Sequence, residues 1–462
     1  MKTYRTILAL VLALCMMGGV VSAMAEGFTL AASYDPGERN FDAGEITTAK
    51  AGEGSGSEVT TDVYPGIEGK DYTDEKFYTY NDFDSELTST TIWDPLSWET
   101  SSDSSILDYL SSGFYTFVLN SDKSGYSVTT ELAAEMPVDV TAEYVGQYGI
   151  AEGETNKAWR IALNQDITWD DGTKVNASDF EYSIQQLLNP KIMNRRADSY
   201  YAGSFVIYNA KNYLYSGKTA YDLVTDSAEN LIAAGTDVYL DMDFWGISGA
   251  PDADGNAAPK YVNINDETMY RDEAVEEGQD EDWVSAKYIF ENYLAEGAPY
   301  NAYQASYLYT ADIAPETSWD QVGFKVIDDY TIDFILEKAV EEPSFYVPYN
   351  LSSSYLVKKD LYEECKKFWD AEGKEVESEE EADTITTDYC RTLETSVSYG
   401  PYKMTSFELD KEYTLSRNEQ WYGYRDGKHL GQYQTDEIKV TVIKEHKTAM
   451  MAFEKGEIDG IG

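Results

Sequence analysis

The spacing of hydrophobic residues predicts β-strands in several parts of this chain. In WRIALN, residues 159–164, apolar side chains alternate with polar ones, which is the period of a half-buried strand. EIKVTVI at 437–443 alternates in the same way, and KFYTYNDF at 76–83 is rich in the aromatic residues that strands favour. In KVIDDYTIDFIL, residues 325–336, an Asp-Asp turn joins two alternating runs, so this segment is predicted to form a β-hairpin.

Other segments have the period of an amphipathic helix. In SILDYLSSGFYTFV, residues 105–118, apolar residues recur at helical spacing as far as Phe114. YLVKKDLYEECKKFW at 355–369 and KTAMMAFEKG at 447–456 show the same spacing, and Gly456 is expected to end the second helix. Strand and helix signals in one chain indicate an α/β fold.

The segment ITWDDGTKVNASDF, residues 167–180, concentrates acidic residues as a catalytic cluster would. Its Asp-Asp-Gly stretch at 170–172 follows an apolar run and is typical of a turn in which the glycine takes a positive φ. Ser178 and Glu181 match the S-x-x-E capping box of a helix. The apolar stripe expected on that helix is Phe180, Ile184, Leu187 and Leu188. Because a solvated turn does not raise a carboxyl pKa as a general acid requires, we interpret these residues as structural.

The N-terminal residues indicate export. A basic start and an apolar run precede an A-x-A pattern at Ala23 and Ala25, so residues 1–25 are predicted to be a secretory signal peptide. Residues 26–75 are rich in glycine, serine and acidic residues, and they are expected to form a flexible linker. No later segment reaches the roughly 20 apolar residues of a membrane span. We expect an exported protein on the periplasmic or extracellular side of the cell membrane.

The net charge narrows the set of partners. The 462 residues include 35 basic and 84 acidic side chains, a net charge of −49. Removing Lys2 and Arg5 with the leader leaves 33 − 84 = −51. Such a charge repels nucleic acid and anionic membrane surfaces. We therefore expect no nucleic-acid partner, and contact with a membrane only through a transporter.

Few residues point to metal or redox chemistry. Cys365 and Cys390 remain after leader cleavage, and export together with their even number makes a disulfide between them possible. His429 and His446, the only histidines, lack the spacing of a metal site or catalytic triad. PDADGN at 251–256 begins like a calcium loop but continues without its glycine and bidentate glutamate. The sequence predicts no metal, no cofactor and no catalytic residue.

The segment at residues 167–180 also resembles the signature of a known family. Seven of its residues fit the pattern W-x-D-G-x-x-V-x-A-x-D-F: Trp169, Asp171, Gly172, Val175, Ala177, Asp179 and Phe180. This pattern resembles the signature of the extracellular solute-binding proteins of peptide transporters, which include oligopeptide- and dipeptide-binding proteins. Three further segments follow in that family's order: VIDDYTIDFIL, SYGPYKMTSFELDKEYTLSRNEQWYG and MMAFEKGEIDGI.

The resemblance implies a periplasmic-binding-protein-like fold of the class II type. Residues 76–117 and 343–462 would form a discontinuous N-terminal lobe with a mixed sheet and flanking helices. Residues 118–342 would form an inserted β-rich subdomain. In the family, the G-E-I-D segment found here at 456–459 lies near the crossing into a second large lobe. Since it lies at the end of this sequence, we expect the second lobe to be missing.

The resemblance also implies capture of oligopeptides and their delivery to the permease subunits of an ABC importer. Seven residues that follow or end predicted strands are candidates for ligand binding: Tyr80, Asn81, Ser353, Ser354, Tyr355, Tyr399 and Gly400. One alternative is a receptor of the same architecture for an oligosaccharide or another solute, since related folds serve several ligands. Another is a secreted hydrolase, for which no carboxylate pair or nucleophile with a base stands out. The sequence does not separate peptide from sugar.

Overall fold

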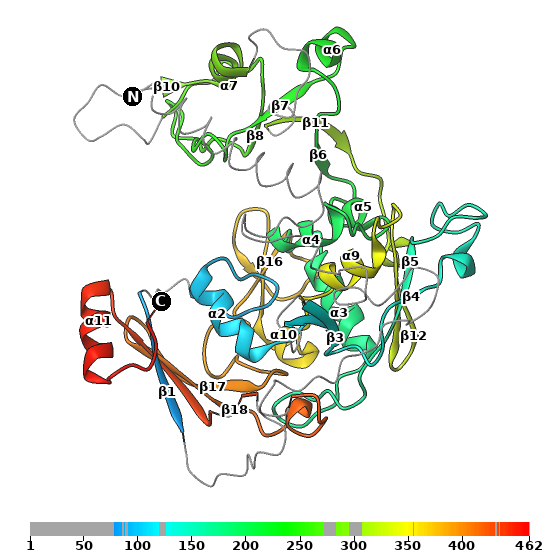
Figure 1. Cartoon of the computed structure of the whole chain (residues 1–462). Coiled ribbons are helices and arrows are strands. Elements are labelled where there is room, and N and C mark those ends of the chain that lie inside the picture. Colours follow the sequence, from blue (N-terminus) through cyan, green and yellow to red (C-terminus); the bar gives the residue numbers. More distant parts are fainter. Residues whose placement is uncertain are drawn as a thin grey trace, which may run out of the picture. The chain divides into compact units, whose positions relative to one another are not determined.

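In a computed structural model of the protein, the described residues are 78–85, 87, 91–119, 126–271, 283–294, 307–353, 355–429, 432–433 and 435–461. They divide into two units (Figure 1). The smaller unit is Tyr215–Glu316, and the larger unit comprises the described residues of 78–214 and 317–461. The predicted signal peptide, 1–25, and linker, 26–75, lie outside the described residues.

The smaller unit is built on a four-stranded antiparallel sheet of order β6-β11-β7-β8. Its strands are β6 (Thr219–Leu223), β7 (Val238–Asp241), β8 (Tyr261–Asn263) and β11 (Leu308–Ile313). The other elements are α6 (Ala228–Ala233), the antiparallel pair β9 (Tyr270–Arg271) and β10 (Trp283–Val284), α7 (Ala286–Ile289) and the π-helical turn η4 (Phe290–Leu294).

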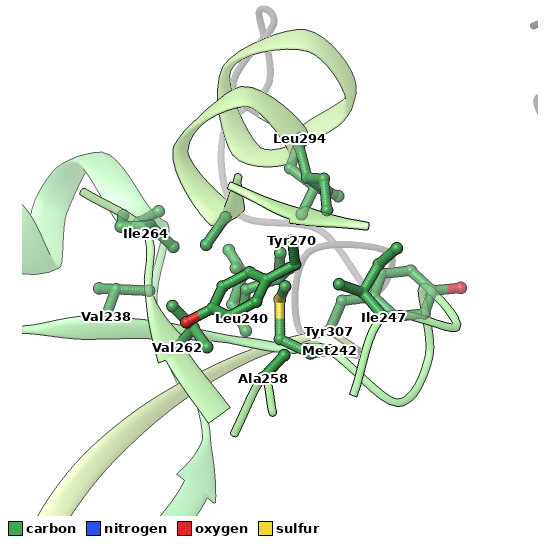
Figure 2. Packing of buried hydrophobic residues seen from close by; sticks show 14 of the residues in the cluster. Val238, Leu240, Met242, Ile247, Ala258, Val262, Ile264, Tyr270, Leu294 and Tyr307 are labelled. Atoms are coloured by element: carbon green, nitrogen blue, oxygen red, sulfur yellow. The ribbon is translucent and has the colours of Figure 1, made fainter. Parts of the chain in front are cut away.

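This sheet has a hydrophobic core of its own. Figure 2 shows Leu240 of β7 and Val262 of β8 packed with Tyr270 and Leu294. Leu240 is fully buried, and alternate positions of β7 are buried as the pleat of a strand requires. Each fully buried side chain of this size contributes about 1.5–3 kcal/mol, so the cluster stabilises the smaller unit internally.

The larger unit contains a mixed sheet of order β1-β19-β18-β17 (Figure 1). Its strands are β1 (Thr79–Asp84), β17 (Tyr402–Glu408), β18 (Glu412–Arg417) and β19 (Glu437–Val442). β1 runs parallel to β19, whereas the other neighbours are antiparallel. Helix α11 (His446–Lys455) follows β19 and ends at Gly456, whose φ of 72° supplies the left-handed cap.

A second sheet, of order β12-β13-β5-β4, carries the aromatic core of the larger unit. It consists of β4 (Val138–Asp139), β5 (Ala158–Ala162), β12 (Phe324–Asp328) and β13 (Thr331–Ile335). Phe334 of β13 is fully buried, and its ring centroid lies 6.1 Å from that of Phe114 and 5.1 Å from that of Phe324. Helix α3 (Ala177–Leu187) adds Phe180, whose ring lies 5.0 Å from that of Phe114.

Two small sheets and several short helices complete the larger unit. The pair β2 (Tyr115–Leu119) and β3 (Tyr126–Thr130) is antiparallel, and β14 (Lys366–Trp369) lies between β15 (Glu375–Val376) and β16 (Thr384–Thr387). The helices are α2 (Ser101–Leu110), α4 (Asp198–Tyr201), α5 (Ala210–Leu214), α9 (Pro343–Asn350) and α10 (Lys359–Cys365). The 3-10 turns are η2 (Thr141–Tyr144), η3 (Arg195–Ala197), η5 (Trp319–Gln321) and η6 (Tyr422–Tyr424). The fold is mixed α/β, as the sequence predicts.

Two predicted helices are shorter than expected because the later residues of each predicted segment form a strand. Helix α2 ends at Leu110, and the aromatic and β-branched residues of Tyr115–Leu119 pair with β3 instead. Helix α10 ends at Cys365, and Lys366–Trp369 pairs with β16. In both cases cross-strand pairing outweighs the helical spacing of the apolar residues.

The turn before α3 is confirmed, but the predicted cap of the helix is wrong. Gly172 has a φ of 86°, as the turn requires. The N-cap is Asn176 instead of Ser178: its Oδ1 accepts a hydrogen bond from Ser178 N at 2.8 Å. Asp179 Oδ2 accepts from Asn176 N at 2.8 Å and completes the capping box. Asn176, and not Ser178, is the N-cap because its side chain accepts a hydrogen bond from an N–H group of the first helical turn, which has no partner within the helix.

The separate unit is smaller than the inserted subdomain predicted at 118–342. Its bounds are Tyr215–Glu316, because β4, β5, β12 and β13 pack with residues of the larger unit. An isolated bridge between Ile207 and Leu336 lies within the larger unit as well. The range 118–342 also contains helices α3 to α7, so it is mixed and not mainly β.

Candidate functional site

The larger unit contains a cavity of about 280 Å³ beside helix α2 and strand β2. Its wall is built from separate parts of the chain, which only the fold brings together. The lining residues are Pro95, Trp98, Ser104, Leu107, Asp108, Ser111, Ser112, Gly113, Tyr115, Thr116, Glu131, Ser352, Ser353, Tyr355, Trp421 and Tyr433. The wall therefore combines aromatic rings, hydroxyl groups and two carboxylates.

Helix α2 has a well-defined start, which sets the position of the cavity wall. Its N-cap, Thr100, accepts a hydrogen bond from Asp103 N, and Asp103 Oδ2 accepts from Thr100 N at 2.9 Å. Asp103 Oδ1 accepts a third hydrogen bond from Ile92 N at 3.0 Å. One turn later along the helix, Leu107 and Asp108 line the cavity.

The opposite part of the wall follows helix α9. Phe114 N donates to Leu351 O at 2.8 Å, and Tyr115 N donates to the same oxygen at 3.3 Å. These bonds tie the beginning of β2 to the chain after α9. As a result Ser352 and Ser353 lie on the cavity wall.

Two aromatic side chains of the wall are held by polar contacts. The hydroxyl of Tyr355 lies 2.6 Å from Ser199 Oγ, and its ring centroid lies 5.5 Å from that of Tyr200. The Arg196 guanidinium stacks 3.5 Å from the ring centroid of Trp98 and donates two hydrogen bonds to the Trp98 carbonyl oxygen, at 2.9 and 2.7 Å. These contacts keep both rings in place beside the cavity.

Glu131 is part of a buried charge network. Its Oε1 lies 3.0 Å from Nε2 of His429, and its Oε2 accepts a hydrogen bond from the Tyr422 hydroxyl at 2.8 Å. The other ring nitrogen of His429 lies 2.7 Å from Asp426 Oδ2. Burial opposes protonation, but the two carboxylates raise the pKa of His429 to about 9. At neutral pH the imidazolium therefore offsets one of the two negative charges of Glu131 and Asp426.

Asp108 differs from Glu131 because it has no charge partner among the residues that the structure describes. Within the described residues it makes no hydrogen bond or ion pair, and partial desolvation raises its pKa. It also lines a neighbouring cavity of about 200 Å³. No lysine or arginine is among the residues that line the larger cavity. The uncompensated charge on the wall is thus negative.

Trp421 lines the cavity, and its indole N–H is buried. Its side chain is 2% exposed, and its indole N–H finds no hydrogen-bond acceptor in the part of the chain that the structure describes. The ring lies 4.8 Å from His429 and 5.1 Å from Tyr433, measured between centroids. A buried donor without an acceptor costs about 1–3 kcal/mol, which makes this position unusual in a folded core.

Two of the residues predicted from the sequence lie at this cavity. Ser353 and Tyr355 both line it, and Ser353 is exposed. Ser354, predicted with them, lies outside the described residues.

Tyr80 and Asn81 lie elsewhere, on strand β1, and do not line the cavity. Asn81 donates to Asp459 Oδ2 from its backbone N at 2.8 Å and from its side chain at 3.1 Å, and Asp459 N donates to Asn81 O at 2.7 Å. Burial, followed by the charges of Asp82 and Asp459, raises the pKa of Tyr80. In the structure Asn81 binds the segment after helix α11 to β1.

Tyr399 and Gly400 are packing residues at the end of α2. Their backbone N atoms donate to Leu110 O at 3.1 and 2.9 Å. A Cβ on Gly400 would lie 2.6 Å from the carbonyl carbon of Leu110, so only glycine allows this approach. Tyr399 is 3% exposed, and its ring lies 5.4 Å from that of Trp169.

The aspartates of the turn at 170–172 have structural partners. Partial desolvation opposes ionisation of Asp171, but its ion pair with Lys358 and hydrogen bonds from Thr173 lower its pKa to about 2. Asp170 is less solvated than the sequence suggests: burial raises its pKa, and its backbone N donates to Ser398 O at 2.8 Å. Both residues connect the turn to distant segments.

Cys365 and Cys390 are buried free thiols in the structure, and the disulfide considered from the sequence is not formed. Asp388 N donates to Cys365 O at 3.1 Å, so the two cysteines lie in neighbouring segments. Cys390 is held by its backbone, with its N donating to Thr395 O at 3.0 Å and its O accepting from Trp93 N at 3.0 Å. Burial raises the pKa of both thiols.

Among the residues that the structure describes, no group of three or more histidine, cysteine and acidic side chains is arranged to hold a metal ion. No helix formed by these residues has the length and apolar character needed to cross a bilayer.

Sequence reasoning missed Asp108, Glu131, His429 and Trp421 as parts of one site. Glu131 and His429 are 298 residues apart, so no local pattern connects them. The one available signal was that His429 is among only two histidines in the chain. In the sequence, Asp108 is only one of the polar positions of a predicted amphipathic helix.

Comparison with known proteins identifies one family and several solved structures. The family described as "Bacterial extracellular solute-binding proteins, family 5 Middle" matches residues 147–241 and 278–462, more than half of the chain. None of the curated proteins matches the sequence.

Similar solved structures include the pheromone receptor PrgZ, with 15% identity and a TM-score of 0.45 over 83% of this chain and 46% of that one. Peptide-bound OppA of Listeria monocytogenes has 14% identity and a TM-score of 0.43, over 83% of this chain and 46% of that one. The substrate-binding domain of an oligopeptide ABC transporter from Bacillus anthracis has 16% identity and a TM-score of 0.42, over 82% of this chain and 44% of that one. The chain thus spans less than half the length of each of these proteins.

Proposed function

The chain belongs to the bacterial extracellular solute-binding proteins of family 5, and we propose that it is an exported receptor that binds oligopeptides for an ABC importer. The observation that carries the proposal is the cavity of about 280 Å³ in the larger unit. Its partners in this role would be a peptide ligand and the permease subunits of the transporter. Ser353 and Tyr355 are the predicted residues that the proposal retains as ligand contacts.

Strand β2 offers a means of binding a peptide backbone. Among the described residues β2 pairs with β3 alone, and Tyr115 N at its start donates to Leu351 O, so no strand covers its other edge beyond Tyr115. Tyr115 and Thr116 of β2 line the cavity. An extended peptide can add to such an edge through main-chain hydrogen bonds, which do not depend on its sequence. The serine hydroxyls of the wall can hydrogen-bond the ligand directly or through water.

The two alternatives from the sequence receive less support. An oligosaccharide could stack on the aromatic rings, but it would leave the edge of β2 unused. A hydrolase needs a nucleophile with a base or a pair of working carboxylates. Of the two carboxylates on the wall, Glu131 is engaged by His429 and Tyr422, which favours a binding role.

Isothermal calorimetry with an equimolar mixture of tetrapeptides, and separately with maltotetraose and cellotetraose, tests the proposal. We expect heat of binding with the peptides alone. Ser353→Trp, which fills the cavity, should weaken peptide binding by at least about tenfold, or 1.4 kcal/mol. Ala151→Trp, the same enlargement at an exposed loop residue outside the cavity lining, is the control and should not change it.

Three outcomes would contradict the proposal. Binding of an oligosaccharide without peptide would favour the sugar receptor. Cleavage of the peptides, followed by mass spectrometry, would favour the hydrolase. Equal affinities in wild type and Ser353→Trp would show that the cavity is not the binding site.

A further inference from the structure

We propose that the cavity beside α2 takes up a basic side chain, lysine or arginine, of a peptide ligand, with Asp108 as the carboxylate that recognises it. This inference rests on the proposed peptide-binding function and adds which side chain the site selects. It derives from the charges, walls and volume of the cavity.

The charge distribution favours a cation. Asp108 has no ion pair or hydrogen bond within the described residues, whereas Glu131 lies 3.0 Å from the His429 imidazolium, which it shares with Asp426. Arg196 keeps its positive charge beside the wall, but its guanidinium is oriented onto the ring and carbonyl oxygen of Trp98 and does not line the cavity. On the wall itself, a ligand cation would therefore meet the Asp108 carboxylate, which has no ion-pair partner among the described residues. Charge-assisted hydrogen bonds of this kind are roughly twice as strong as neutral ones.

The walls suit a long side chain with a charged end. Trp98, Tyr115, Tyr355, Trp421 and Tyr433 all line the cavity. Lysine and arginine bury their methylene stems along apolar surfaces while the charged group keeps polar contacts. Aromatic faces also attract an ammonium or guanidinium, by about 0.5–2 kcal/mol. A glutamate side chain would gain neither interaction and would be repelled by Asp108.

The volume indicates a side-chain pocket and not a site for a whole peptide. Sites that enclose complete small-molecule ligands measure about 300–1,000 Å³. At about 280 Å³ the cavity lies at the lower end of this range, which fits one side chain better than a whole peptide. Since Tyr115 N is bonded to Leu351 O, a peptide backbone would pair with β2 beyond Tyr115, where Thr116 lines the cavity and a ligand side chain could enter it.

The experiment uses five alanine-based pentapeptides and calorimetry on the full chain. Their central residue is lysine, arginine, Nε-acetyllysine or glutamate, and the fifth is the lysine peptide with an acetylated N-terminus. The lysine and arginine peptides should bind at least tenfold more tightly than the Nε-acetyl and glutamate peptides. Acetylation of the N-terminus should have little effect on the affinity of the lysine peptide. This result would show that the site recognises the side-chain ammonium and not the terminal one.

Variants distinguish Asp108 from the general negative field of a chain with net charge −49. Asp108→Asn should abolish the preference for lysine over Nε-acetyllysine, and Asp108→Lys should reverse the preference between lysine and glutamate. Glu152→Gln removes the same charge at an exposed loop position outside the cavity lining, and it should retain the wild-type preference. Asp108 is exposed, so both substitutions are compatible with folding, which circular dichroism checks.

The outcomes separate this inference from the proposed function. Tight binding of all five peptides with equal affinity would overturn the basic-side-chain inference and leave the peptide receptor standing. A lysine preference that persists in Asp108→Asn, or one that is lost on N-terminal acetylation, would overturn it as well. No binding of any peptide would overturn the proposed function and this inference together.

Discussion

His429 Nε2 lies 3.0 Å from Glu131 Oε1, although 298 residues separate them in the chain. The contact joins the end of β3 to the loop after η6, next to the candidate cavity. Both side chains are largely buried, with 7% of His429 and 11% of Glu131 exposed. The pair therefore holds one wall of the cavity by an interaction that depends on protonation.

The stability of the protein should fall as pH rises through about 9. The folded pKa of His429 is about 9, above its ordinary 6.5, because the hydrogen bonds and charges of Asp426 and Glu131 outweigh the effect of burial. A raised pKa contributes stability that is fully present below pH 6.5 and lost as pH rises through 9. The contribution is about 3 kcal/mol at most.

Urea unfolding of wild type and His429→Gln at pH 6, 8 and 10 measures this contribution. The difference in free energy of unfolding should be largest at pH 6 and small at pH 10. His446→Gln, at the other histidine and exposed, is the control and should match wild type at every pH. A difference between wild type and His429→Gln that does not vary with pH would contradict the assignment.

Asp333 is expected to be a major stabilising residue of the larger unit. Its side chain is fully buried and accepts two hydrogen bonds from Arg160, at 2.9 and 2.8 Å, and one from the Tyr144 hydroxyl at 2.6 Å. Asp333→Asn leaves the arginine without its buried partner and should lower the free energy of unfolding by roughly 3 kcal/mol. Glu143→Gln removes the exposed partner of the same arginine and should cost under about 1 kcal/mol. Similar losses in both variants would contradict the burial argument.

The turn before α3 should tolerate loss of charge better than loss of its glycine. Gly172 has a φ of 86°, so Gly172→Val should lower stability by on the order of 1 kcal/mol or more. Gly172→Asn should cost less, since asparagine tolerates this backbone conformation. Asp171→Asn should leave peptide affinity intact, because Asp171 binds Lys358 and Thr173 and does not line the cavity. Thermal melting and calorimetry test both statements, and a large loss of affinity in Asp171→Asn would contradict the second.

Cys365 and Cys390 should behave as protected thiols. They are 7% and 2% exposed, and burial raises both pKa values, so the reactive thiolate is scarce. Alkylation without reductant should be slow in the native protein and complete at both positions in urea. Mass spectrometry of the two cysteine peptides measures this. A linked peptide that resists alkylation in urea would instead support the disulfide considered from the sequence.

Local patterns were sufficient for most individual elements of the larger unit. Strands at 158–162 and 437–442, the hairpin of β12 and β13 and the helix ending at Gly456 all follow from alternation, helical spacing or a glycine cap. The errors in helix length occur where a strand follows a helix, as after Leu110 and Cys365. There, pairing with β3 or β16 decides the structure, and the partner strand is not a local neighbour.

By itself the sequence determined the α/β class, the family resemblance and the turn at Gly172, because each depends on residues close together in the chain. The tertiary structure alone decided which candidate residues share a site. It placed Ser353 and Tyr355 at the cavity, Tyr399 and Gly400 in packing contacts, and Asn81 against Asp459. It also brought Asp108, Glu131 and Trp421 together. Their proximity results from long-range strand pairing and from burial in a shared core, and neither leaves a periodic signal in the sequence.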